Sequence, residues 1–349
     1  MPISDYEASV GNWREGLKRN ERKTRLVIIT FILIYVGVGL IADSAINISN
    51  YPNVPLTQIL TALITFKIVP WATIIMAVIA GISLLVTYSM YDTIMLLGTE
   101  YHEITAENAQ NLQEKQLYNV VEEMKVAAGL RYMPKVYLIE ADYMNAFASG
   151  YSEKSAMVAI TRGLIEKLDR AELQAVMAHE LSHIRHNDIK LTLTVAVLSN
   201  ILLIVIDILF YSVIYRGNND RRQNNNANTL ATVIIVLRYV LPLITVLLTL
   251  FLSRTREYMA DSGSVELMRD NEPMARALLK ISQDHLNHAN EYSHEYGETP
   301  HEQIRQASYL FDPSSIDPVK SLFNAFSTHP QIEQRLEAIG FKRRKDKSG

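Results

Sequence analysis

The 349-residue sequence contains no cysteine. This absence excludes a disulfide framework and any thiolate metal site, so a transition-metal site would have to use histidine, aspartate or glutamate. A strong charge of either sign is also missing, because the formal net charge is -3, and that balance gives no support to nucleic-acid binding. With roughly 150 residues per structural unit, the length predicts two to three units.

Four long apolar stretches carry almost no charge. A membrane-spanning helix needs about 20 apolar residues, and four segments meet or approach this length: 26–48, 68–91, 191–215 and 230–252. The alternative for the last two is a pair of buried helices in a soluble core. We expect the first stretch to be a retained signal anchor, because it is long enough to span and no cleavable signal peptide is apparent.

Basic residues are distributed unevenly around these stretches. The loop after the first stretch holds only Lys67, whereas six basic residues precede that stretch: Arg14, Lys18, Arg19, Arg22, Lys23 and Arg25. The positive-inside rule therefore predicts a cytoplasmic N-terminus. The loop at 216–228 disagrees, since it holds three arginines. The predicted organisation is a cytoplasmic segment 1–25, a transmembrane hairpin 26–91, a cytoplasmic part 92–190, a second hairpin 191–252 and a cytoplasmic part 253–349.

The second hairpin contains two charges, Asp207 and Arg238. They lie at similar distances from the connecting loop, and an unpaired charge inside a membrane is costly. We therefore predict an ion pair between them. The alternative is that each side chain reaches separately toward the outer surface.

The charged parts of the chain show mixed helical and strand patterns. Residues 105–129 carry apolar side chains at helical spacing and end at Gly129, a natural C-cap. Asp169 and Glu172 form a capping-box pattern that starts another helix. The remaining predictions are strands at 136–139, 145–149 and 156–161, helices at 163–168 and 331–339, helix after the fourth stretch to about 289, and a loop-rich segment at 290–320.

The segment His179-Glu180-Leu181-Ser182-His183 is an H-E-x-x-H pattern. Two histidines four residues apart share one helix face, so both imidazoles can reach one cation. Glu180 borders the metal without binding it and can take a proton from a metal-bound water. The pattern also arises by chance, when the histidines are simply solvated on a helix, so it needs support from elsewhere in the chain.

A catalytic zinc needs a third protein ligand. His186 lies about 10 Å further along an unbroken helix, too far from His179, so we disfavour it. Glu257 is the better candidate, because we expect the H-E-x-x-H helix to run unbroken into the third stretch, and the inner ends of the hairpin then meet. Asp261 could accept a hydrogen bond from a ligand histidine. Ordinary salt bridges of both carboxylates with Arg254 or Arg256 are the alternative.

Four motifs in order extend this pattern: NAFASG at 145–150, HELSH at 179–183, SRTREYMAD at 253–261 and STHPQIEQR at 327–335. With the four apolar stretches, they resemble the HtpX family of membrane zinc metalloproteases, which is related to the CAAX prenyl proteases. The resemblance implies one zinc per chain, with Glu257 as the third ligand. It implies that Asp261 contacts a metal ligand and not the metal itself. It further implies an edge strand with Asn145, Ala146 and Phe147 that binds the substrate backbone, and a pair, His329 and Arg335, that steadies the oxyanion.

The expected fold is therefore mainly α, a four-helix integral membrane protein with a cytoplasmic gluzincin-like zinc protease domain containing a small β-sheet. The resemblance implies an endopeptidase of the bacterial inner membrane that faces the cytoplasm and cleaves damaged or misassembled membrane proteins. Polypeptides and the lipid bilayer are its expected partners. Two alternatives remain open: a CAAX-type processing protease and a non-catalytic zinc-binding membrane scaffold.

Overall fold

The computed structural model describes residues 3–8, 13–96, 100–150, 152–215, 225–289, 291–292, 310 and 329–343. The chain divides into two compact units. The apolar unit comprises residues 25–87 and 192–249, and the polar unit comprises residues 1–24, 88–191 and 250–349. The polar unit is thus assembled from three separate segments of the chain.

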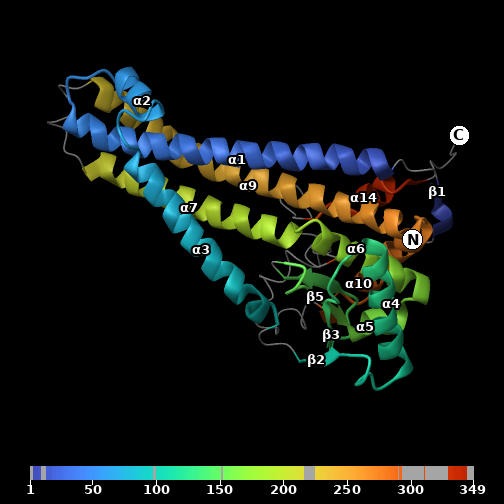
Figure 1. Cartoon of the computed structure of the whole chain (residues 1–349). Coiled ribbons are helices and arrows are strands. Elements are labelled where there is room, and N and C mark those ends of the chain that lie inside the picture. Colours follow the sequence, from blue (N-terminus) through green and yellow to red (C-terminus); the bar gives the residue numbers. More distant parts are fainter. Residues whose placement is uncertain are drawn as a thin grey trace, which may run out of the picture. The chain divides into compact units, whose positions relative to one another are not determined.

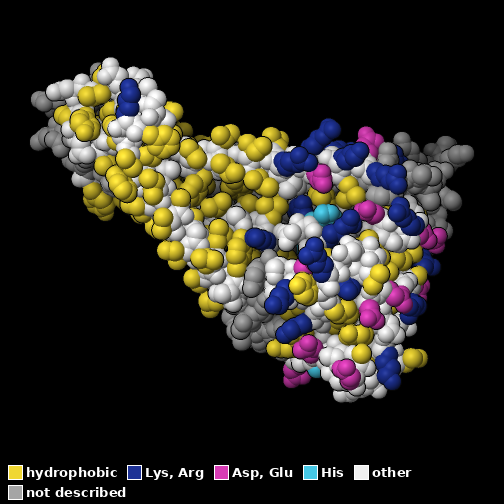
Figure 2. Space-filling model, viewed as in Figure 1, with side chains coloured by type: hydrophobic (Ala, Val, Ile, Leu, Met, Phe, Trp, Pro, Cys, Tyr) yellow, Lys and Arg dark blue, Asp and Glu magenta, His cyan; other side chains and the backbone are white. Residues whose placement is uncertain are grey.

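Four helices among the described residues are long and apolar enough to cross a membrane, as predicted. They are α1 (Trp13–Asn50), α3 (Trp71–Leu96), α7 (Asp188–Tyr215) and α9 (Asn225–Met268). A short helix that we did not predict, α2 (Leu56–Ile64), follows α1. Within the apolar unit, buried aliphatic side chains from these helices form one cluster, and Figure 2 shows many more on the outer surface. Apolar side chains on the outside as well as the inside suit a lipid surrounding.

Two acidic side chains of the apolar unit have defined partners. Asp43 is buried and accepts hydrogen bonds from the backbone N–H groups of Ala72 and Thr73, which start α3. Asp207 on α7 forms an ion pair with Arg238 on α9, so the predicted pairing is confirmed. Both carboxylates therefore have the partners that a charge in an apolar surrounding requires.

The polar unit contains a four-stranded sheet with the strand order β2-β3-β5-β4. β3 and β5 are parallel, with Val136 opposite Val158, and the two outer strands are antiparallel to their neighbours. The strands are β2 (Tyr101–Ile104), β3 (Lys135–Ile139), β4 (Ala146–Ser149) and β5 (Met157–Thr161). Three of them were predicted, whereas β2 was not. β4 lies at one edge of the sheet.

Helix α6 (Arg170–Arg185) lies next to the sheet in the polar unit (Figure 1). It contacts β4 on one side and packs against α4 (Leu112–Ala128) and α10 (Glu272–Asn287). The predicted capping box is present, because Asp169 and Glu172 bind each other's backbone N–H. The remaining elements are η1 (Ile3–Asp5), α5 (Arg162–Lys167), α14 (Ile332–Ala338) and the paired strands β1 (Tyr6–Ala8) and β6 (Phe341–Arg343).

Three predicted helix boundaries are wrong. α4 begins at Leu112 and not at 105, because the Asn111 side chain caps it by accepting the N–H of Glu114. The H-E-x-x-H helix does not continue into the third span: α6 ends at Arg185, and Asn187 has a left-handed φ of 54°. Arg269, with φ 57°, likewise separates α9 from α10. The predicted loop at 290–320 lies almost entirely outside the described residues.

Candidate active site

The polar unit brings His179, His183 and Glu257 together, although Glu257 lies 74 residues after His183 in the sequence. The Nε2 atoms of the two histidines, both on α6, are 3.2 Å apart. The Glu257 carboxylate on α9 lies 3.7 Å from Nε2 of His179 and 3.6 Å from Nε2 of His183. One ligand atom from each residue falls within 4.8 Å of the others, so the three can hold one metal ion.

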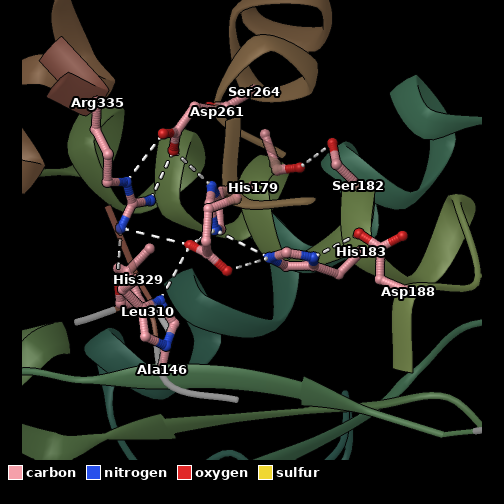
Figure 3. Close-up of polar contacts among 12 residues, drawn as sticks. Ala146, His179, Ser182, His183, Asp188, Asp261, Ser264, Leu310, His329 and Arg335 are labelled. Carbon is pink, nitrogen blue, oxygen red and sulfur yellow. Dashed lines mark hydrogen bonds and ion pairs between the residues drawn. The ribbon is translucent and has the colours of Figure 1, made fainter. Parts of the chain in front are cut away.

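The outer nitrogen of each histidine faces a carboxylate (Figure 3). Nδ1 of His179 lies 3.0 Å from Asp261, and Nδ1 of His183 lies 2.8 Å from Asp188. Burial lowers the pKa of His183 to about 3, so this ring is neutral and donates its one proton to Asp188. Nε2 of His183 therefore offers a lone pair toward the Glu257 carboxylate, an arrangement that a divalent cation fits.

Close packing of α6 against α9 sets the distance between the histidines and Glu257. Gly263 on α9 faces Ser182 on α6, and a Cβ added at Gly263 would lie 2.4 Å from the Ser182 hydroxyl. The Ser264 hydroxyl donates to the carbonyl oxygen of Ala175 at 2.7 Å, which joins the two helices at a second point. Only glycine allows this approach, so the pair of helices holds the three ligands in register.

Glu180 lies between the ligand helix and the edge strand. It is 1% exposed, and its carboxylate accepts a hydrogen bond from the backbone N–H of Ala148 in β4. Burial, and then the negative charge of Glu257, raise the pKa of Glu180 well above its usual range. A cation at the ligand position would counter both effects, because it favours the charged form of a neighbouring carboxylate.

Arg335 and His329 approach the ligands from the segment around α14. Arg335 is fully buried and donates two hydrogen bonds to Asp261, from Nε at 2.9 Å and Nη2 at 2.6 Å. Its Nη1 lies 3.6 Å from Glu257, and Nδ1 of His329 lies 3.4 Å from the same carboxylate. The predicted oxyanion pair thus lies beside the third ligand, and Arg335 also holds Asp261 against His179.

The three residues of the predicted substrate strand, Asn145, Ala146 and Phe147, are all buried. Asn145 precedes β4, and its side-chain oxygen accepts the N–H of Ala146 at 3.0 Å. Its backbone carbonyl accepts from the N–H of Thr161, at the end of β5. These contacts hold the start of β4 in place next to Glu180.

Asp188 is the site residue that sequence reasoning missed. It follows Asn187, whose left-handed conformation turns the chain between α6 and α7 and brings the carboxylate back to His183. Arg256 forms an ion pair with Asp188, not with Glu257 or Asp261 as the alternative held. His186 follows the end of α6 and is not in the metal-binding group of the described residues. An aspartate shortly after the second histidine was the available signal.

Two histidines on one helix, a carboxylate from a second helix and a buried glutamate beside them define a metallopeptidase site of the H-E-x-x-H class. Residues 111–341 match the model of peptidase family M48. The chain belongs to this family and is a multi-pass membrane metalloprotease.

Curated relatives match along nearly the whole chain. A protease HtpX homolog of Helicobacter pylori is 42% identical over 94% of this chain and 98% of its own length. Another, from Streptococcus uberis, is 32% identical over 93% of this chain and 98% of its own length. The crystal structure of S. mikatae Ste24p is 18% identical, with a TM-score of 0.47, and the match covers 90% of this chain and 66% of that one.

Proposed function

We propose that this protein is a zinc endopeptidase that cleaves damaged or misassembled membrane proteins at the cytoplasmic face of the inner membrane. The observation that carries the proposal is the convergence of His179, His183 and Glu257 beside Glu180. Nitrogen and oxygen donors in this number, with no thiolate, suit a catalytic zinc that keeps one position open. The relatives named as HtpX protease homologues support a protease function. The quality-control role is what the resemblance to the HtpX family implies.

Each protein group has a defined task in this chemistry. Zinc bound by the three ligands would polarise the scissile carbonyl and acidify a water molecule. Glu180 takes the proton of the attacking water and returns it to the leaving amine, for which a buried carboxylate beside the ligands is well placed. His329 and Arg335 supply positive charge and N–H donors for the developing oxyanion.

The edge strand β4 supports a polypeptide as the substrate. An extended peptide can add to an open sheet edge, where main-chain hydrogen bonds give affinity whatever the side chains are. Recognition of this kind suits an enzyme that must accept many different damaged proteins. Asn145, Ala146 and Phe147 would form the start of that edge.

The decisive experiment compares the purified wild-type protein with the Glu180→Gln variant. Both should contain one zinc per chain, and only the wild type should cleave casein in a chelator-sensitive manner. Glu166→Gln is a matched control, because the same change at an exposed position of α5 should leave cleavage unchanged. Proteolysis by pure Glu180→Gln would refute the role of Glu180, and a metal-free wild type would refute the zinc site.

The proposed orientation can be tested directly because the chain has no cysteine. Single cysteines would be placed at exposed Glu166 in the polar unit and at exposed Asn53 between α1 and α2. A membrane-impermeant maleimide should label the Asn53→Cys variant in spheroplasts and the Glu166→Cys variant only in inverted vesicles. The reverse pattern would place the active site outside the cytoplasm.

A further inference from the structure

The edge of the sheet beside the active site is already occupied by a residue of the same chain. The backbone N–H of Leu310 donates a hydrogen bond to the carbonyl oxygen of Ala146 at 2.9 Å. The backbone carbonyl of Leu310 accepts a hydrogen bond from Nη1 of Arg335 at 2.7 Å. Figure 3 shows Leu310 beside Arg335 and Ala146. Leu310 is also 1% exposed, so its side chain is enclosed.

The Ala146 carbonyl lies on the side of β4 that faces away from β5, the outer edge of the sheet. Asn145 turns its backbone toward β5, where its carbonyl binds the N–H of Thr161. Backbone groups alternate between the two sides of an antiparallel strand, so Ala146 and Ala148 turn theirs to the opposite side. Ala148 binds Glu180 on that side, and Leu310 binds Ala146 there. Leu310 therefore contacts the same outer edge of β4 as the proposed general base, Glu180.

Arg335 connects Leu310 to the metal ligands. Its Nη1 donates to the Leu310 carbonyl and lies 3.6 Å from Glu257, while its other nitrogens hold Asp261. A peptide that adds to β4 next to the ligands must offer an N–H to Ala146 and place a carbonyl near Arg335. Leu310 offers both groups.

Building on the proposed function, we infer that Leu310 occupies the position of a substrate residue and competes with peptides for the edge strand. A peptide binds only when Leu310 leaves. The smaller the fraction of protein in which Leu310 is displaced, the lower is the apparent affinity for every substrate. The same position accepts a large aliphatic side chain, because a leucine side chain is enclosed there. Substrates with such a residue next to the scissile bond are therefore the best competitors.

Two variants separate the backbone contact from the side-chain contact. Leu310→Pro removes the N–H that Ala146 accepts, and Leu310→Ala shortens the enclosed side chain. With an internally quenched casein peptide that contains leucine, each should lower KM by about fivefold with kcat unchanged, since one hydrogen bond or a few methyl groups no longer favour the internal occupant. The control is Leu286→Ala, which truncates an exposed leucine on α10 and should change neither constant.

A binding measurement makes the test independent of cleavage. In the Glu180→Gln background, fluorescence anisotropy of the labelled peptide should show the same fall in Kd for both Leu310 variants. This result would support the inference even if the wild type cleaved nothing, which would instead refute the proposed function. Unchanged or higher KM and Kd in both variants would overturn the inference. Loss of zinc or of the cooperative melting transition in both would overturn it too, because Leu310 would then be part of the fold.

Discussion

The carboxylate of Asp188 gives a quantitative test of how the site holds its metal. Asp188 is 4% exposed and accepts the Nδ1 proton of His183 at 2.8 Å, which leaves Nε2 free of a proton and facing the ligand position. The Asp188→Asn variant keeps the shape of the side chain and removes its charge. Loss of such a partner typically costs about 10- to 100-fold in metal affinity, so we expect zinc binding to weaken by about 1.4–2.7 kcal/mol.

A second effect must be separated from this one. Asp188 also pairs with buried Arg256, and removing one partner of a buried ion pair destabilises a protein by about 3–5 kcal/mol. Asp188→Asn should therefore also lower the melting temperature. Adding Arg256→Met removes the unpaired cation and should restore most of the melting temperature, but not the zinc affinity, because His183 still lacks its carboxylate.

Zinc affinity would be measured by competition with a chromophoric chelator, and melting would be followed in the same buffer. Asp284→Asn serves as the control, because Asp284 pairs with Lys167 and Tyr292 outside the metal site. That change should lower stability and leave the zinc affinity unchanged. The reasoning fails if Asp188→Asn binds zinc like the wild type, or if Arg256→Met restores the lost affinity.

Three further predictions follow from packing, protonation and charge. Gly263→Ala should destabilise the protein by about 1–3 kcal/mol in denaturant unfolding and reduce activity, and adding Ser182→Ala should recover part of both. Burial lowers the pKa of His285 to about 4, below its ordinary 6.5, so its contribution to stability is complete above pH 6.5 and falls by up to about 3 kcal/mol as the pH drops toward 4. The melting temperature should fall as the pH is lowered from 6.5 toward 4, and His285→Phe should reduce this fall. Neutralising Asp207 or Arg238 alone should lower accumulation in membranes, and exchanging the two charges should restore it; additive losses in the exchange would argue against the pair.

The features that could be predicted from the sequence are those that depend on a short spacing pattern or on local composition. His179 and His183 follow from helical periodicity alone, and the four apolar helices follow from length and hydropathy. Glu257 was placed near the histidines on the expectation of an unbroken helix from α6 into the third span. That expectation was wrong, yet the structure does bring Glu257 to the histidines, because α6 and α9 pack directly at Gly263.

What could not be predicted depends on single backbone conformations and on long-range contacts. Asn187 can continue a helix or end one in the left-handed conformation, so its residue type alone did not decide between the two. Its φ of 54° shows that the chain turns there and returns Asp188 to His183. Leu310 carries no motif, and its two backbone bonds join residues 164 and 25 positions away. Pairing of β1 with β6 likewise joins strands too short to have a pattern of their own.

The assembly of the polar unit from three chain segments has a consequence for biosynthesis. Ribosomes deliver the H-E-x-x-H helix first, Glu257 only after the second apolar hairpin, and Arg335 later still. Until Arg335 has emerged, Asp261 lacks the guanidinium that holds it in the complete protein. Since the third metal ligand, Glu257, is translated only after the four apolar stretches, a nascent chain cannot complete the ligand set before every stretch has been synthesised.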